Sequence, residues 1–171
     1  MEKTIVLRNT EITFSIWDLG GQREFLSMLP LVCNDAVAIF FMFDLSRKST
    51  LLSVKEWYRQ ARGLNRVSNT SFASVIIVEY AHSSLLLPQT AQAFLVGTKF
   101  DIFTTLPPEE IDEIDKLARK YAKAMKAPLV FSSASHSINV QKMFKIVLSK
   151  VFDLKCTVAE IVEVGEPLLI F

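Results

Sequence analysis

The motif Trp17-Asp18-Leu19-Gly20-Gly21-Gln22 combines residue types that could act on a phosphate group. An Asp at the end of a strand can hold Mg²⁺, usually through water, and a following Gly lets a backbone N–H approach a phosphate. A Gln just beyond can orient an attacking water molecule. Taken alone, the same hexapeptide also fits a strand followed by an ordinary Gly-Gly turn.

Two further motifs carry groups that could read a nucleobase. In Thr98-Lys99-Phe100-Asp101, the carboxylate can accept two N–H bonds from one edge of guanine while the lysine stem lies along the base plane. Ser133-Ala134-Ser135 could present backbone N–H groups to a base oxygen. Each motif alone is a commonplace turn, and only their joint occurrence points to a nucleotide.

The elements that would position these motifs alternate between strand and helix. Apolar, β-branched and aromatic runs predict a hairpin, three later strands and three helices. The expected strands cover residues 4–7, 12–17, 36–43, 93–97 and 128–131, and helices begin near residues 46, 107 and 140. This order predicts an α/β fold with a mostly parallel sheet and helices on both faces, which binds ligands at the carboxyl ends of its strands. The three motifs follow three of these strands, as such a site requires.

The chain resembles the Ras superfamily of small GTPases, and within it the septation-initiation GTPases of fungi. In that superfamily Asp-x-x-Gly-Gln, Asn/Thr-Lys-x-Asp and Ser-Ala-x are the third, fourth and fifth guanine-nucleotide motifs. The stretches that carry the likeness are residues 16–25, 28–38, 55–62, 135–142 and 165–169. The resemblance implies a Ras-like fold, GTP/GDP and Mg²⁺ as cofactors, and GTP hydrolysis.

Carried over residue by residue, the resemblance gives each motif a role. It implies that Asp18 contacts Mg²⁺ through a water molecule, that Gly21 senses the γ-phosphate and that Gln22 is the catalytic residue that orients the attacking water. The implied nucleotide-binding residues are Gly21, Thr98, Lys99, Asp101, Ser133, Ala134 and Ser135. Thr98 stands where most of the superfamily has Asn. Whether Thr98 makes the side-chain contact with the phosphate loop that this Asn makes is left open.

The resemblance also implies a biological role and partners. It implies regulation of septation, cytokinesis and mitotic exit through GTP-dependent contact with a protein kinase effector and a GTPase-activating protein complex. A monomer in the cytoplasm, with a spindle pole body location, is expected by family.

No phosphate-binding loop of the form Gly-x-x-x-x-Gly-Lys-Ser/Thr is present, because none of the five glycines is followed by Lys. We therefore expect residues 1–171 to form a single incomplete domain without the family's first strand, phosphate loop and first helix. Losing about five charge-assisted hydrogen bonds removes roughly 7–15 kcal/mol of gross binding free energy. Against about 12 kcal/mol for a ~1 nM site, the remainder is near-millimolar at best. This chain is thus predicted to be inactive as a GTPase.

Residues 67–92 break the charge pattern, since they contain no Lys or Arg and one acid, Glu79. We interpret them as a non-family insertion, possibly a retained intron; the alternative is a real loop specific to this group. The family's first strand would lie between the strands that end at Asp18 and Asp44, so its absence predicts two apolar edges that face a gap and poor solubility. Residues 155–171 are expected to form a C-terminal extension.

Composition excludes several classes of function. A formal net charge of +1 gives no excess positive charge that would attract nucleic acid. Neither Cys156 nor the Phe171 end forms a prenylation motif, so no membrane anchor is expected. Two cysteines make no disulfide framework, which favours a cytosolic chain. Two alternatives stay open: a nucleotide-independent interaction module, and a flavodoxin-like or receiver domain.

Overall fold

The computed structural model describes residues 2–7, 10–21, 23–28, 36–63, 74–80 and 91–171. The predicted opening hairpin is confirmed: strands β1 (Glu2–Leu7) and β2 (Thr10–Leu19) pair antiparallel. A 3-10 helix, η1 (Arg23–Met28), follows. Strand β3 (Ala36–Asp44) and helix α2 (Lys48–Gly63) then form the first strand-to-helix step, as the apolar run and helical spacing predicted.

The rest of the chain adds four strands and three helices to the part that the structure describes. They are β4 (Ser74–Tyr80), β5 (Gln92–Thr98), α3 (Phe100–Phe103), α4 (Pro108–Met125), β6 (Leu129–Phe131), α5 (Val140–Val151) and β7 (Leu169–Ile170). The short α3 was not expected from the sequence. Helix α5 ends at Val151, although apolar residues recur at helical spacing as far as Leu154 in the sequence.

The described strands form one sheet in the order β1-β2-β4-β3-β5-β6-β7. Strands β3, β5 and β6 are parallel neighbours, and β2 runs in the same direction because β4 is antiparallel to both β2 and β3. The carboxyl ends of β2, β3, β5 and β6 therefore meet at one edge of the sheet. That edge is where an α/β sheet binds ligands.

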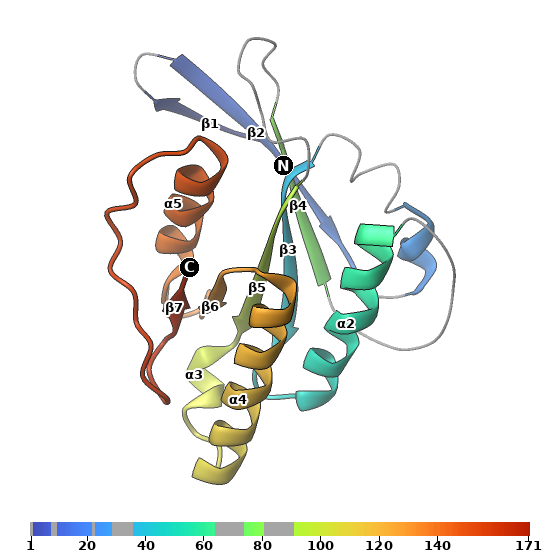
Figure 1. The fold of residues 1–171 in the computed structure, drawn as a ribbon, viewed down its shortest axis with the longest axis vertical. Coiled ribbons are helices and arrows are strands. Elements are labelled where there is room, and N and C mark those ends of the chain that lie inside the picture. Colours follow the sequence, from blue (N-terminus) through green and yellow to red (C-terminus); the bar gives the residue numbers. More distant parts are fainter. Residues whose placement is uncertain (1, 8–9, 22, 29–35, 64–73, 81–90) are drawn as a thin grey trace.

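Helices cover both faces of the sheet, with α2 and α4 on one face and α5 on the other (Figure 1). Each face of the sheet packs against its helices in a hydrophobic core, and alternate residues of β3 belong to one core or the other. Phe41 packs toward α2 and α4, whereas Phe40 packs toward α5. Trp57 of α2 is among the largest fully buried side chains of the described residues. No helix of the described residues is long and apolar enough to cross a lipid bilayer.

Strand β4 corrects the expectation of a gap in the sheet. It lies between β2 and β3, with Ile76 opposite both Asp18 and Phe40 in the backbone register. Both edges that were predicted to be open are thus hydrogen-bonded. The prediction failed because it treated residues 67–92 as foreign to the fold, whereas a β-rich run beside two unpaired edges pairs with them. Whether these residues are a retained intron stays a prediction, and residues 67–73 and 81–90 lie outside the described residues.

The last segment of the chain folds back onto the sheet. Strand β7 pairs antiparallel with β6, and Leu168 and Leu169 are fully buried. Ile161 and Leu169 exchange two backbone hydrogen bonds of 2.9 Å, which close this segment on itself. We call residues 161–171 the tail.

Candidate nucleotide site

The turns that follow β5 and β6 bring two of the three predicted motifs together at the carboxyl edge. The amide of Phe100, just past β5, donates to the carbonyl of Ser132, just past β6, over 3.0 Å. Lys99 between them takes a left-handed conformation with φ of 59°, which turns the chain sharply into α3. Asp101 and Ser133 are placed side by side as a result.

Asp101 and the Ser133 turn form a polar cluster. The Ser133 hydroxyl donates to Oδ1 of Asp101 over 2.5 Å and lies 3.0 Å from the Ser135 hydroxyl. His136 Nδ1 lies 3.7 Å from Oδ2 of Asp101 and 3.0 Å from the Ser135 hydroxyl. The hydrogen bond from Ser133 lowers the pKa of Asp101 below its ordinary value. The carboxylate is therefore ionised and stays partly exposed, as a group that accepts N–H bonds from a ligand must be.

The backbone of the same turn also has donors to offer. Ala134 and Ser135 are exposed, and within the described ranges no acceptor is paired with the amide N–H of Ala134. A carboxylate and an N–H without a protein acceptor among the described residues, on adjoining turns, are complementary to a guanine edge, which presents N–H donors beside a carbonyl oxygen. The predicted base-reading residues Asp101, Ser133, Ala134 and Ser135 are thus brought together.

Thr98 and Lys99 are positioned differently from the sequence interpretation. The Thr98 hydroxyl donates to the backbone carbonyl of Phe43 over 3.0 Å, so it ties β5 to β3. Nζ of Lys99 lies 2.9 Å from Oδ2 of Asp44. The lysine ammonium is therefore held at the end of β3, and its predicted contact with a base plane stays a prediction.

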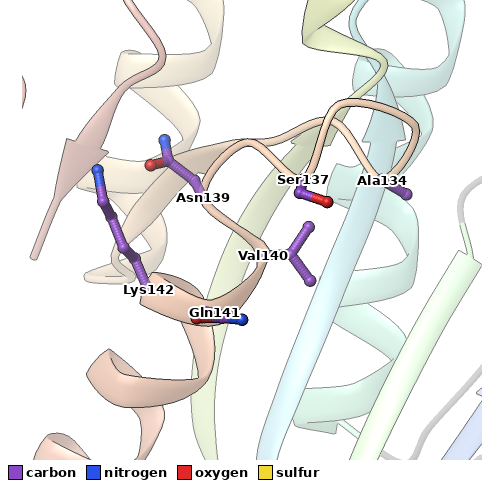
Figure 2. Close-up of a pocket in the computed structure, with 6 residues that line it drawn as sticks. All are labelled: Ala134, Ser137, Asn139, Val140, Gln141 and Lys142. Atoms are coloured by element: carbon purple, nitrogen blue, oxygen red, sulfur yellow. The ribbon is translucent and has the colours of Figure 1, made fainter.

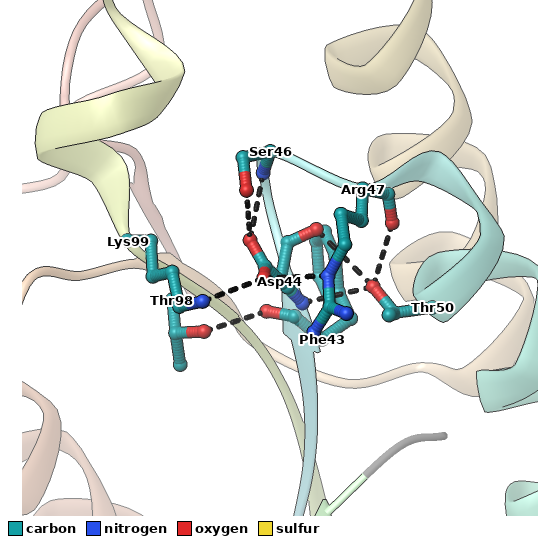
Figure 3. A network of polar contacts seen from close by, with 7 residues as sticks. All are labelled: Phe43, Asp44, Ser46, Arg47, Thr50, Thr98 and Lys99. Carbon is teal, nitrogen blue, oxygen red and sulfur yellow. Dashed lines mark hydrogen bonds and ion pairs between the residues drawn. The ribbon is translucent and has the colours of Figure 1, made fainter.

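Asp44 is the residue that the sequence reasoning missed as a functional group. Its buried carboxylate accepts hydrogen bonds from the Ser46 amide (2.9 Å), the Ser46 hydroxyl (2.6 Å) and Arg47 Nε (2.9 Å), besides the Lys99 ion pair (Figure 3). Burial raises the pKa of Asp44, but the four donors outweigh it and lower the pKa to about 2. Its place at the end of a buried strand, like Asp18 and Thr98, was the signal that could have found it.

The phosphate-side residues are not joined to this cluster. Asp18, near the end of β2, is exposed, and among the described residues no polar contact links it or Gly21 to the Asp101 cluster. Gln22 lies outside the described residues. The structure thus brings together the residues predicted to read the base and does not join Asp18 or Gly21 to them; the roles of both groups stay predictions.

A pocket of about 330 Å³ lies beside the Ser133 turn, on the side of α5 (Figure 2). Its lining comes from the loop between β6 and α5 and from the first turn of α5, and comprises Ala134, Ser137, Asn139, Val140, Gln141 and Lys142. Asp101 does not line it. The pocket therefore adjoins the Asp101 cluster without containing its carboxylate.

The residues fit a nucleobase better than they fit a metal ion. Mg²⁺ in nucleotide sites is bound by one or two carboxylates together with substrate phosphates. The described residues contain no group of three His, Cys, Asp or Glu side chains close enough to hold a metal. Asp18 alone, without a Gly-Lys phosphate cradle in the chain, does not make a magnesium site.

Comparisons with known proteins agree with the fold and the motifs. A model of the Ras family matches residues 1–153. The chain is 65% identical over 169 residues to "Septum-promoting GTP-binding protein 1" of Schizosaccharomyces pombe, covering 99% of this chain and 74% of that protein. It is 26% identical over 144 residues to Ras-related protein Rab-22A of Mus musculus, covering 84% of the chain, and 23% identical over 146 residues to Ras-related protein Rab-31 of Homo sapiens, covering 85%.

The chain spans about 60% of the length of these Rab proteins. The family match covers both turns of the Asp101 cluster and every strand from β1 to β6. The fold is Ras-like, and the chain belongs to the Ras family, whose members bind GTP or GDP with Mg²⁺.

Proposed function

We propose that the protein is a small GTP-binding protein that regulates septation and mitotic exit by GTP-dependent switching. The observation that carries this proposal is the 65% identity, over 99% of the chain, to a septum-promoting GTP-binding protein. The Asp101 cluster also supports it, because a carboxylate beside a turn with a backbone N–H donor is complementary to guanine, which such a switch must recognise. In the cell, the proposed partners are a protein kinase effector and a GTPase-activating protein complex, at the cytoplasm and spindle pole body.

In this site Asp101 is the residue proposed to select guanine. Its ionised carboxylate, held in place by the Ser133 hydroxyl at 2.5 Å, accepts the two N–H groups on one edge of the base. Adenine offers no such pair of donors at that edge, so it leaves the carboxylate without partners. The Ala134 N–H is proposed to donate to the base oxygen.

We further propose that residues 1–171 by themselves do not hold GTP usefully. The chain has no Gly-Lys pair, and β4 occupies the place between β2 and β3 in the direction opposite to its neighbours. A strand in that direction starts, rather than ends, at the carboxyl edge, so no loop follows it there as loops follow β5 and β6. Only base contacts remain, which support near-millimolar affinity at best.

Equilibrium titration of the purified chain tests both parts of this proposal. We expect labelled GDP with Mg²⁺ to show no binding tighter than about millimolar, and micromolar retention would overturn the claim of inactivity. GMP at millimolar concentration should shift the amide resonances of Ala134 and Ser135, whereas AMP should not. Asp101→Asn should change the preference of the chain from GMP to XMP. The matched control is Asp112→Asn, which neutralises an exposed carboxylate on α4.

A second function is favoured by one observation, the completeness of the sheet without a nucleotide. Because β4 pairs on both sides, the described strands leave no unpaired edge in the centre of the sheet. Such a chain could act as a nucleotide-independent interaction module. Capture of the kinase effector that is equal with GDP, GTP or no nucleotide would favour this alternative, and capture that requires GTP would exclude it.

A further inference from the structure

The loop that joins β6 to α5, residues 132–139, is connected to the tail through one side chain. Nδ2 of Asn139 donates to the carbonyl of Phe131, at the end of β6, over 2.9 Å. It also donates to the carbonyl of Pro167, in the tail, over 2.7 Å. Both partners are carbonyl oxygens, which only accept, so the orientation of the amide is fixed by its contacts.

Asn139 is built into the fold rather than lying on its surface. It is 5% exposed and takes a left-handed conformation with φ of 57°, which turns the chain into α5. Few residue types other than Gly, Asn and Asp adopt this conformation readily. A buried donor with two acceptors at this turn therefore joins three segments: the end of β6, the start of α5 and the tail.

The loop that Asn139 closes is the one that positions the base-reading groups. The amide of Ser133 donates to the carbonyl of Ile138 over 3.1 Å, and the amide of Ile138 donates back over 2.9 Å. This two-bond bridge, directly before Asn139, fixes Ser133, whose hydroxyl holds Asp101. A displacement of Asn139 would therefore be transmitted to Asp101 through two short steps.

The tail is attached to the same strand by further bonds. The amide of Phe131 donates to the carbonyl of Leu168 over 2.9 Å, and Leu168 and Leu169 are fully buried. The tail thus covers the free edge of β6, the strand from which the base-side loop departs. This segment lies beyond the residues matched by the Ras family model, which end at 153.

We propose that Asn139 is a positioning residue of the base-side loop, and that through it the docked tail sets the conformation of the loop that holds Asp101. Docking of the tail and ordering of the loop are then coupled equilibria. Because coupling between two sites is reciprocal, a ligand that orders the loop must also stabilise the docked tail. For the nucleotide part, this inference rests on the proposed function.

Amide hydrogen exchange of the full chain, without any ligand, tests the coupling directly. Asn139→Gly removes both side-chain bonds and keeps the left-handed backbone accessible. Two lost hydrogen bonds predict about 5- to 30-fold faster exchange at Ile161 and Leu169 in the tail and at Ser133 and Ile138 in the loop. The matched control is Ser137→Gly, an exposed loop residue with φ of 54°, which adds the same backbone freedom without touching the tail.

The control is expected to change tail exchange by less than about threefold. If Asn139→Gly accelerates only the loop, only the tail, or neither beyond Ser137→Gly, the proposal is overturned. Circular dichroism and the unfolding midpoint confirm that both variants are folded. Should Asn139→Gly fail to fold, Leu169→Ala, which loosens the tail without changing the loop sequence, must still accelerate exchange at Ser133 and Ile138.

Exchange measured with added GMP distinguishes a failure of the Asn139 coupling from a failure of the proposed base site. In the unaltered chain and in Ser137→Gly, millimolar GMP should slow exchange at Ile161 and Leu169, which are not among the proposed base-reading residues. In Asn139→Gly this tail response should be lost, and GMP should bind about 3- to 10-fold more weakly. GMP that binds the unaltered chain without protecting the tail overturns the proposal. Failure of the unaltered chain to bind GMP contradicts the proposed base site, while the ligand-free exchange still decides the role of Asn139.

Discussion

Asp44 gives the sharpest test of how the carboxyl edge is held together. Its carboxylate is 7% exposed and accepts four hydrogen bonds or ion pairs, whereas its partners Arg47 and Lys99 are more than half exposed. Replacing Asp44 with Asn keeps the shape and one acceptor oxygen but removes the charge. The two cations remain solvated by water in the variant. The loss in free energy of unfolding caused by Asp44→Asn therefore measures the contribution of the carboxylate charge.

The magnitude follows from the pKa of Asp44. Its ordinary value is 3.8 and its value in the folded protein is about 2. At about 1.4 kcal/mol for each pKa unit, the ionised carboxylate contributes about 2–3 kcal/mol to the free energy of unfolding. Because the folded pKa is depressed, this contribution is present above about pH 4 and is lost as the pH falls through about 2.

Urea unfolding followed by circular dichroism at pH 7, 5, 4 and 3 measures this contribution. Asp44→Asn should lower the free energy of unfolding by about 2–3 kcal/mol at pH 7 and pH 5, and the difference should narrow at pH 4 and pH 3. The matched control is Asp112→Asn, which breaks an exposed ion pair with Lys116 of 2.6 Å on the surface of α4. This control should cost less than about 1 kcal/mol.

Two results would refute this reasoning about Asp44. One is a loss for Asp44→Asn that does not exceed the loss for Asp112→Asn at pH 7. The other is a large loss that stays constant from pH 7 to pH 3, because an effect independent of proton binding cannot come from a depressed pKa. Either would mean that packing at the end of β3, rather than charge, stabilises this edge.

The same urea titration checks three further substitutions. Gly97→Ala should lower the free energy of unfolding by about 1–3 kcal/mol, since its Cβ would lie 2.8 Å from Leu45 Cδ2 and 3.0 Å from Phe131 Cδ1; a neutral result would show that the core yields there. Trp57→Ala should cost about 3–5 kcal/mol because Trp57 is 1% exposed, and a cost below about 1 kcal/mol would contradict that burial. Thr50→Val should cost about 1–3 kcal/mol, since it leaves two backbone groups before α2 without the hydroxyl; an unchanged midpoint would show that water replaces it.

Hydrophobic pattern accounts for the parts of the fold that could be predicted from sequence. The run from Ala36 to Phe43 is apolar at both odd and even positions, which predicts a strand covered on both faces. Helices do cover both faces of β3. Apolar residues recur at helical spacing from Leu51 to Ala61, and α2 ends two residues later at Gly63. Neither β4 nor β7 was placed, because the partners of a strand depend on which edges of the other strands are free, and this is a property of the assembled sheet.

The candidate site was predictable to the extent that motifs follow strands. Asp101 and Ser133 were identified because each stands just after a β-strand, and strand order then places them together. The position of Asp44 at the end of β3 could have identified it, but its ion pair with Lys99 and the role of Asn139 could not be predicted, because both depend on side-chain contacts between segments distant in sequence. The Lys99–Asp44 pair joins β5 to β3, and Asn139 reaches Pro167 in the tail. No local periodicity or spacing encodes such contacts.

The direction of β4 supports the proposal that this chain presents only the base-reading half of a nucleotide site. A strand that ends at the carboxyl edge places the next loop over that edge, as β5 and β6 do for Asp101 and Ser133. Strand β4 begins at that edge, with Val75 opposite Leu19 and Phe41, and ends at the far one. Any parallel strand between β2 and β3 would have to displace it, at the cost of two antiparallel ladders. The base-reading half is independent of that exchange, because β5, β6 and the tail lie on the other side of β3. The two halves of the proposed site are therefore separable in this fold, which is why we propose base recognition without phosphate binding.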